Sequence, residues 1–268
     1  MIIRFTCEYD GATFSGFQRQ KNATSVQGVL ENALERALGQ KITLHASGRT
    51  DAGVHASGQV CSFKYPGSLI CYSDAKGSGE ESSVSTTLEG KPVCFFKLQG
   101  SVNSFLPKSI RIRDIGCAPD NFNARFDVQA KIYVYKCYIS RIPSPLRDTQ
   151  MMQLHSVPNM ELMRAAAEQL VGRHDFTSFS STKTDKQDKI RTIHSINITA
   201  PAHDEIHFAI RGDGFLRNMV RIIIGTLLDV GNLKTCPLGI KEILDARNRE
   251  RAGTTAPAHG LCLIDVEY

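Results

Sequence analysis

The sequence predicts a mixed α+β fold with antiparallel sheets. Strand-like runs with period-two alternation and amphipathic helical segments follow one another, but without the strict strand–helix–strand rhythm of a parallel sheet. Two strand-like runs, 191–200 and 205–211, are separated by a short connection, as in an antiparallel pair. A length of 268 residues suits one large domain or two modest ones, and an apolar fraction of 41% can form a sizeable core.

In the first half, alternation predicts strands at 2–9, on both sides of residue 51, at 93–98 and at 110–115. Thr24 and Gln27 have the spacing of a capping box, which predicts a helix that begins there and ends at Gly39. Between 66 and 92 the composition shifts to Gly, Ser and Glu. The core of this segment, 73–83, cannot bury apolar surface, and we expect a variable insertion.

The second half repeats these signals. Besides the pair at 191–200 and 205–211, strands are expected at 130–140 and 261–266. Helices are expected from Asn159, as N-cap, to Leu170, and at 215–230 and 238–248. We place the boundary between the halves near residue 118, which gives regions 1–118 and 119–268.

Composition limits the partners and the compartment. A net charge of +5 and a pI of about 8.8 favour a polyanionic partner. Nothing near residue 1 resembles a secretory signal, and no run is long and apolar enough to span a membrane. The eight cysteines are scattered singly, without metal-binding spacing. We interpret them as small buried hydrophobes in a cytosolic protein without a metal site.

The segment Gly-Arg-Thr-Asp-Ala-Gly-Val-His at 48–55, followed by Ser-Gly-Gln-Val at 57–60, is the most informative in the chain. Strand-like sequence on both sides would present the carboxylate of Asp51 at the end of a sheet. Because a carboxylate is ionised at neutral pH, Asp51 could act as a nucleophile or base. A plain polar hairpin turn is the alternative, since Asp and Gly are common turn residues.

This segment resembles the signature of the TruA family of tRNA pseudouridine synthases. The resemblance runs from Tyr9 to Tyr268 with one gap at 66–92, and its supporting elements are 10–20, Asn103 with Leu106 and Pro107, 172–179 and the C-terminal Gly260-Leu261 and Val266-Glu267-Tyr268. It implies two ferredoxin-like halves whose antiparallel sheets abut, with the active site in the cleft between them. It also implies a homodimer that isomerises uridine to pseudouridine in the anticodon stem-loop of tRNA, at positions 38, 39 and 40, without a cofactor or metal.

The resemblance assigns catalytic roles to Asp51 and Arg221. In the family the aspartate breaks the N1–C1′ bond of uridine, and the base rotates and rejoins through C5. Arg221 lies in an apolar helical run and would need an anionic partner, which an ordinary structural ion pair could also supply. By resemblance its partner is Asp51. Arg217, one turn earlier on the same face of the predicted helix, could contact phosphate or simply be solvated.

The remaining family positions would contact RNA. Tyr133 could be a core aromatic, but by resemblance it stacks on a flipped uracil. Arg49 could hold a phosphate or occupy the place of the extruded base. Gln18, Arg19 and Gln20 are expected to reach RNA, with a solvated loop as the alternative. His55 is expected to be structural.

Two other classes of function stay open at this point. A catalytically silent RNA-binding module or RNA chaperone is disfavoured because Asp51, Arg221 and Tyr133 are all present. A metal-free nuclease or glycosidase is disfavoured because a second acid and a His partner are missing. The sequence also leaves open whether Asp51 attacks C1′ or C6 of uridine, or promotes elimination through a glycal.

Overall fold

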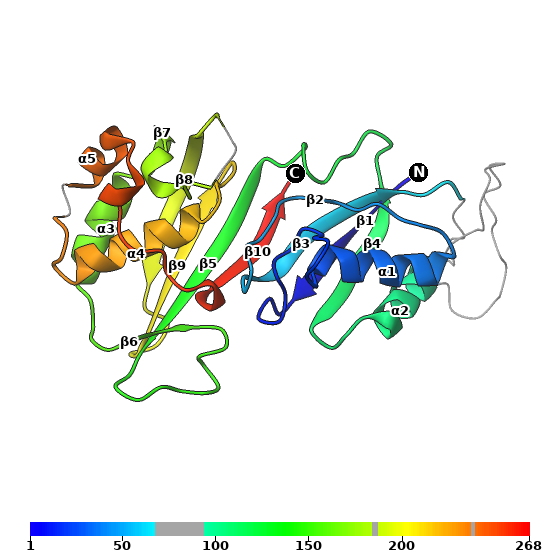
Figure 1. The fold of residues 1–268 in the computed structure, drawn as a ribbon, viewed down its shortest axis with the longest axis horizontal. Helices are drawn as coiled ribbons and strands as arrows, with labels where there is room; N and C mark the ends of the chain where they lie inside the picture. The colour runs from blue at the N-terminus through cyan, green and yellow to red at the C-terminus, as the bar shows by residue number, and fades with distance from the viewer. Residues whose placement is uncertain (68–93, 184–186, 237–238) are drawn as a thin grey trace.

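The structure, a computed structural model, describes residues 1–67, 94–183, 187–236 and 239–268. Within these residues, ten strands form one sheet that runs the length of an elongated molecule (Figure 1). The strands are β1 Ile2–Tyr9, β2 His45–Ala46, β3 His55–Lys64, β4 Ile110–Ala118, β5 Ala130–Ile139, β6 Met152–Leu154, β7 Gly172–Asp175, β8 Ile190–Thr199, β9 Glu205–Gly212 and β10 Leu261–Glu267. The predicted insertion at 66–92 lies almost entirely outside the described residues, as does its core at 73–83.

The sheet is mostly antiparallel and continuous across the two halves. Its strand order is β4-β1-β3-β10-β5-β9-β8-β7, with β2 paired to β3 and β6 paired to β5. The last strand, β10, therefore lies between β3 of the first half and β5 of the second. It is antiparallel to β5 but pairs with β3 in parallel at only two positions, Cys262–His55 and Leu263–Ala56. We call this β3–β10 junction the seam.

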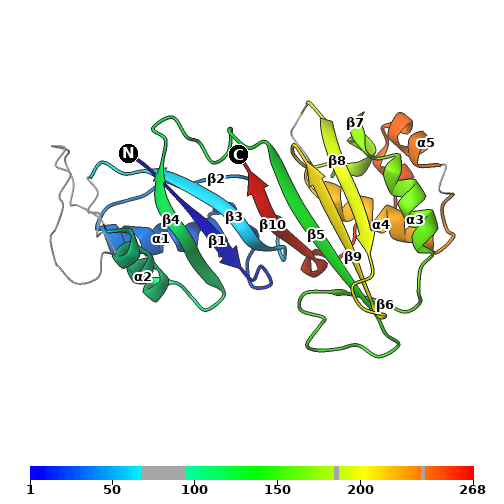
Figure 2. The same ribbon diagram turned by 180° about the vertical axis from the view of Figure 1, so that it is seen from behind.

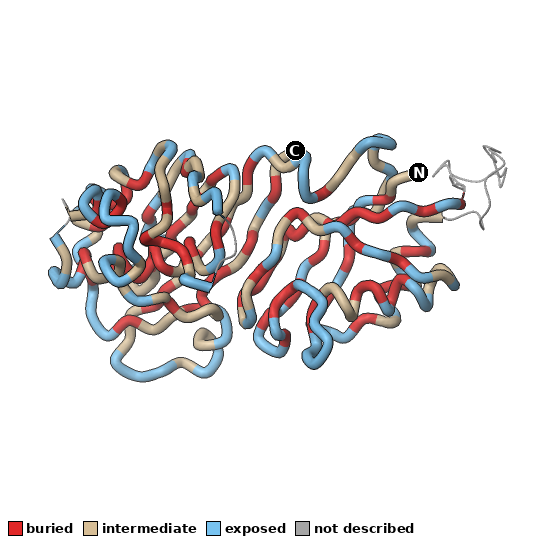
Figure 3. Tube along the Cα trace, turned by 45° about the horizontal axis from the view of Figure 1, so that its top comes forward, coloured by how far each residue is buried: buried red, intermediate tan, exposed pale blue. Residues whose placement is uncertain are grey.

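Helices cover one face of the sheet. The α-helices of the described residues are α1 Val26–Leu38, α2 Phe95–Phe105, α3 Met160–Glu168, α4 Met219–Gly231 and α5 Gly239–Ala246, and the short 3₁₀ turns are η1 Thr177–Phe179, η2 Arg249–Arg251 and η3 Ala258–Gly260. Helices α1 and α4 lie in front of the strands in Figure 1, and Figure 2 shows the uncovered face. Helix α4 is buried along nearly its whole length, whereas in strands such as β1 and β9 every second residue is buried; buried residues are red in Figure 3. No helix in the described ranges is long and apolar enough to cross a membrane.

The strand predicted at 93–98 is wrong, because the chain forms helix α2 from Phe95. Leu98 and Val102 are its buried residues, four positions apart, and Leu106 follows at the same spacing. This period fits one face of a helix and not a strand. The Arg36 guanidinium of α1 lies 4.1 Å from the centre of the Phe105 ring, which joins the two helices.

Two helix starts also differ from the prediction. The N-cap of α1 is Ser25 and not Thr24, since the Ser25 hydroxyl accepts the Gly28 N–H at 3.3 Å. Helix α4 begins at Met219 instead of 215, because a turn closed by Met219 N–H and the Leu216 carbonyl precedes it. The short strands β6 and β7 were not predicted, and the strand before the Asp51 turn, β2, has only two residues.

The cysteine prediction holds for three positions and fails for two. Cys7, Cys61 and Cys137 are buried, whereas Cys117 and Cys236 are exposed. Cys117 is the eighth residue of β4, a strand at the end of the strand order.

Candidate active site at the seam

Asp51 lies in a four-residue turn shortly before β3. The Val54 N–H donates to the Asp51 carbonyl oxygen at 3.2 Å and closes the turn. Gly53, at the third position, has φ 78°, a conformation that favours glycine there. The side chain of Asp51 is 30% exposed. The turn therefore leaves the carboxylate partly accessible to solvent just before β3 begins.

The loop after β1 holds this turn in place. The Phe17 N–H donates to the Thr50 carbonyl oxygen at 3.1 Å, and the Tyr9 and Thr50 hydroxyls share a hydrogen bond of 2.8 Å. Gly16 has φ 95°, and a Cβ at this position would lie 2.9 Å from the Thr50 carbonyl oxygen. These contacts fix the position of Asp51 through the backbone and its neighbour.

Arg221 reaches Asp51 from the other half of the chain. Its Nη1 lies 4.0 Å from Asp51 Oδ2, at the outer limit of an ion pair. Its Nε donates to the Ala256 carbonyl oxygen at 2.7 Å, and Nη1 donates to Asn218 Oδ1 at 3.2 Å. The Ala256 N–H in turn donates to the Arg221 carbonyl oxygen at 3.0 Å. Helix α4 and the segment before β10 thus hold the guanidinium facing Asp51.

Tyr133 of β5 is buried beside this pair, with 7% of its surface exposed. Its ring meets Phe215 edge-on, with 5.3 Å between centroids and an angle of 87°. Burial, and next the negative charge of Asp51, raise the pKa of the Tyr133 phenol well above its ordinary value. The phenol is therefore protonated at neutral pH. Tyr135, two residues later, donates to the Pro257 carbonyl oxygen at 2.9 Å.

The four predicted RNA-contacting residues outside β5 are exposed: Gln18, Arg19, Gln20 and Arg49. The Arg19 Nη1 donates to Glu31 Oε2 at 2.8 Å, and the side chain of Glu31 is only 8% exposed. Gln20 Nε2 donates back to the Ser15 carbonyl oxygen at 2.7 Å. Arg19 therefore anchors the loop to α1 as well as facing solvent.

Arg217 is not on the helix that carries Arg221. Because α4 begins at Met219, Arg217 lies in the turn before the helix, where it is exposed. The predicted placement one turn earlier on the same face is wrong.

Sequence reasoning missed three contacts around the site. The Lys131 Nζ of β5 donates to the Ser47 carbonyl oxygen at 2.6 Å, which is a further link between the halves. The Asn218 side chain and the Ala256 carbonyl hold Arg221. An Asn directly before a helical run is a recognisable signal, but it predicts a cap and not a partner for arginine. A backbone carbonyl carries no sequence signal.

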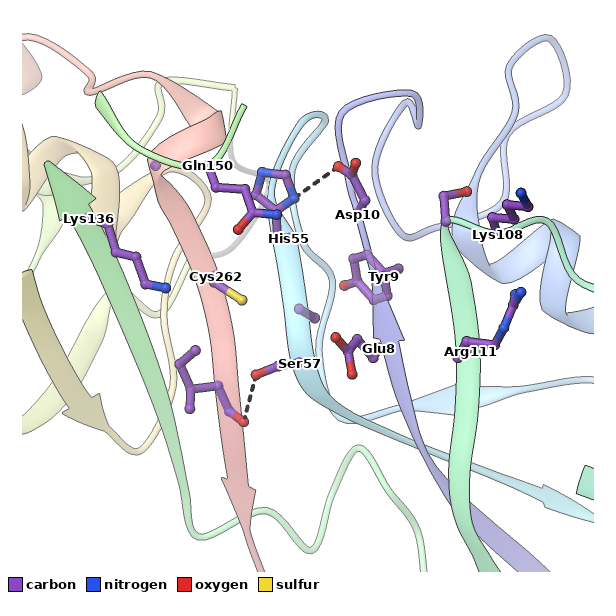
Figure 4. A pocket seen from close by; sticks show the side chains of 14 residues that line it. Glu8, Tyr9, Asp10, His55, Ser57, Lys108, Arg111, Lys136, Gln150 and Cys262 are labelled. Atoms are coloured by element: carbon purple, nitrogen blue, oxygen red, sulfur yellow. Dashed lines mark hydrogen bonds and ion pairs between the residues drawn. The ribbon is translucent and has the colours of Figure 1, made fainter. Parts of the chain in front are cut away.

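A separate hollow of about 350 Å³ lies on the uncovered face of the sheet (Figure 4). Its lining carries charges of both signs, from Glu8, Asp10, Lys108, Arg111 and Lys136. Lys136 is three residues from Tyr133 in β5, so the two side chains point to opposite faces. Asp51, Arg221 and Tyr133 do not line this hollow. The hollow is therefore separate from the candidate catalytic residues.

His55 lines the same hollow and contacts the loop after β1. Its Nδ1 accepts the Gly11 N–H at 3.1 Å and lies 3.1 Å from Asp10 Oδ1. These contacts fit the structural role expected for His55. Among the described residues, no group of three or more His, Cys, Asp or Glu side chains is placed to hold a metal ion.

Comparison with known proteins decides the family. Residues 6–92 and 166–268 match the sequence profile of a family described as tRNA pseudouridine synthase. The chain belongs to the tRNA pseudouridine synthase family. Enzymes of this family isomerise uridine in tRNA to pseudouridine. The matched ranges contain Asp51 and Arg221, whereas Tyr133 lies between them.

Full-length relatives of this family support the assignment. A protein named tRNA pseudouridine synthase A from Brevibacillus brevis is 41% identical over 266 residues, covering 99% of both chains. The proteins of the same name from Bacillus subtilis and Syntrophotalea carbinolica are 40% and 38% identical and cover 100% of this chain, with 99% and 96% of their own lengths matched. Among solved structures, the archaeal box H/ACA sRNP Nop10-Cbf5 complex overlaps at 10% identity and a TM-score of 0.35, over 84% of this chain and 44% of that one, which supports no argument.

Proposed function

We propose that this enzyme converts uridine to pseudouridine in the anticodon stem-loop of tRNA, at positions 38, 39 and 40, with Asp51 as the nucleophile. The observation that carries the proposal is the meeting of Asp51 and Arg221 across the seam, with 4.0 Å between their charged atoms. A single ionised carboxylate beside a held cation suits a reaction that needs neither a second acid nor a metal.

In this proposal the reaction is an internal exchange of bonds. The N1–C1′ bond of uridine breaks, the base rotates, and C5 bonds to C1′. C5 then loses its proton, and N1 gains one, so that no cofactor or outside group is required. Asp51 supports this by attack on C1′ or C6, or by promoting elimination through a glycal. Arg221 faces the carboxylate with its positive charge and helps to orient it.

The proposed substrate contacts follow from exposure and charge. A uracil flipped out of the RNA stacks on the ring of Tyr133, which the half-buried Phe215 supports edge-on. Arg49 directly precedes the clamped residue Thr50 and takes a phosphate or the place left by the base. Gln18, Arg19 and Gln20 continue this polar surface on the neighbouring loop.

The proposal also covers the division of the chain into two halves and its oligomeric state. We assign 1–118 and 119–268 to two ferredoxin-like halves, whose strands meet at the seam where the active site lies. We further propose that the enzyme works as a homodimer in the cytoplasm, with one tRNA contacting both subunits and without a cofactor or metal. The net charge of +5 supports a polyanionic partner.

Mapping pseudouridine in tRNA tests the proposal. The purified chain would be incubated with a tRNA transcript that carries uridine at 38, 39 and 40, and with three transcripts that each have cytidine at one of them. We expect pseudouridine at these positions, and loss of one modification with each replacement. Pseudouridine confined to another part of the tRNA, or none in any transcript, would overturn the proposed substrate site.

A further inference from the structure

Asn218 occupies the N-cap of α4 but does not cap the helix. Its backbone is left-handed, with φ 61° and ψ 2°, and its side chain makes no hydrogen bond to the first turn. Other caps in the same chain behave in the usual way. Asn159 accepts the Leu162 N–H at 3.0 Å at the start of α3, and Ser25 accepts the Gly28 N–H in α1. The side chain of Asn218 is therefore directed elsewhere.

The preceding turn explains the backbone of Asn218 but not its side chain. Met219 N–H donates to the Leu216 carbonyl oxygen at 3.0 Å, which puts Asn218 at the third position of a four-residue turn. A positive φ at that position favours Gly or Asn. Glycine would satisfy the turn equally well. The amide must be explained by what it contacts.

Asn218 Oδ1 accepts a hydrogen bond of 3.2 Å from Arg221 Nη1. This is the same nitrogen that lies 4.0 Å from Asp51 Oδ2. Nη1 carries two N–H groups, so the one that is not bonded to Asn218 remains available to Asp51. On the far side of the guanidinium, Nε is held by the Ala256 carbonyl at 2.7 Å.

We propose that Asn218 is a positioning residue for catalysis, which orients the Arg221 guanidinium toward Asp51. This rests on the proposed pairing of Asp51 and Arg221 in the reaction. An amide is suited to the task because it accepts a hydrogen bond without adding a charge that would compete with Asp51 for the arginine. Within the described residues it is the one side chain that hydrogen-bonds this guanidinium.

Asn218→Gly separates the two roles, because glycine keeps the left-handed turn and removes only the acceptor. We expect kcat on tRNA to fall on the order of 10- to 100-fold, since a loosened catalytic group is costly, while KM stays within about twofold. Asn159→Gly is the matched control. It removes a true helix cap and should lower the melting temperature slightly without changing kcat.

A double-mutant cycle with Arg221→Lys shows whether Asn218 acts through Arg221. Lysine lacks the planar fork of arginine, so adding Asn218→Gly to Arg221→Lys should lower kcat by less than about twofold further. Additive losses in the cycle, a wild-type kcat for Asn218→Gly, or failure of that variant to fold would each overturn the inference. Asp51→Asn measured in parallel separates the two proposals: if it stays active, the proposed function fails instead.

Discussion

Asp51 and Arg221 approach each other from the two halves of the chain, but they are held in different ways. The Asp51 turn is fixed through its backbone and its neighbour Thr50, by contacts from Phe17, Gly16 and Tyr9. Arg221 is fixed through its own side chain, with Nε on a backbone carbonyl and Nη1 on an amide oxygen.

This difference suits the two roles proposed for these residues. The Asp51 carboxylate is 30% exposed, and among the described residues its charged partner is Arg221. A nucleophile must have its oxygens accessible to the substrate, so rigidity is better supplied through the backbone. The arginine is 17% exposed and acts as a fixed charge, which gains from hydrogen bonds that orient it before substrate arrives.

Among the changes that leave Asp51 itself in place, removing the held cation should lower kcat most. Arg221→Ala leaves Asp51 without its partner and the Ala256 carbonyl without its donor. We expect a loss of about 100-fold or more in kcat, and about 1–3 kcal/mol in the free energy of unfolding. Turnover assays and thermal melting would measure both.

Arg217→Ala is the matched control for this change, because Arg217 is an exposed arginine in the turn just before α4. It should leave the melting temperature unchanged and at most weaken tRNA binding. If Arg221→Ala matched it in both measurements, Asp51 and Arg221 would not function as a pair.

We call the contacts that Phe17, Gly16 and Tyr9 make with Thr50 the backbone clamp. Disturbing this clamp should have the next largest effect on kcat. Gly16→Ala would place a Cβ 2.9 Å from the Thr50 carbonyl oxygen at φ 95°. We expect an unfolding free energy lower by about 2–5 kcal/mol and a kcat lower by about tenfold. Gly39→Ala has the same backbone strain, with φ 71°, but open space around the added Cβ. It should cost about 1–2 kcal/mol and leave kcat unchanged. Equal kcat values for the two variants would show that the clamp does not position Asp51.

Part of this candidate site could be predicted from the sequence. The rest could not, because it depends on how distant segments of the chain pack together. The 48–60 segment identified the Asp51 turn, and Arg221 was recognised as a cation that needs an anion. Long-range contacts were beyond reach, because the Ala256 carbonyl and the Lys131–Ser47 link depend on how distant segments pack. Helix α2 was mistaken for a strand because a short apolar run such as 93–98 does not distinguish the two periods.

Replacing Tyr133 should have a graded effect. Tyr133→Phe keeps the ring that meets Phe215, so tRNA binding should stay near wild type. Tyr133→Leu removes the stacking surface and should weaken binding by about 1–3 kcal/mol. Equilibrium binding and turnover would compare them. A Phe variant that binds normally but is inactive would assign proton transfer to the hydroxyl, and wild-type behaviour of both would leave Tyr133 a core residue.

Alkaline unfolding offers an independent check on the surroundings of Tyr133. Burial and the charge of Asp51 raise the pKa of this phenol in the folded chain. Above about pH 10 the unfolded chain therefore releases this proton first, and stability falls as pH rises. Tyr133→Phe should lose stability less steeply than wild type above that pH. Identical slopes in pH-dependent melting would show that the phenol is not in this environment.

The hollow on the uncovered face should contribute least to catalysis. Lys136→Ala changes its charge but lies across the sheet from Tyr133. We expect kcat and KM within about twofold of wild type, because none of the proposed site residues Asp51, Arg221 and Tyr133 lines the hollow. A kcat loss as large as that of Gly16→Ala would show that the two faces are coupled.

The most direct test of this account is the single-turnover rate of Asp51→Asn on bound tRNA, with the exposed Asp120→Asn as control. The amide keeps the shape of the side chain and removes the nucleophile. We predict a rate at least about a thousandfold below wild type, with tRNA affinity within about twofold, and a control that matches wild type. Pseudouridine formation by Asp51→Asn at a rate comparable to wild type would contradict the account.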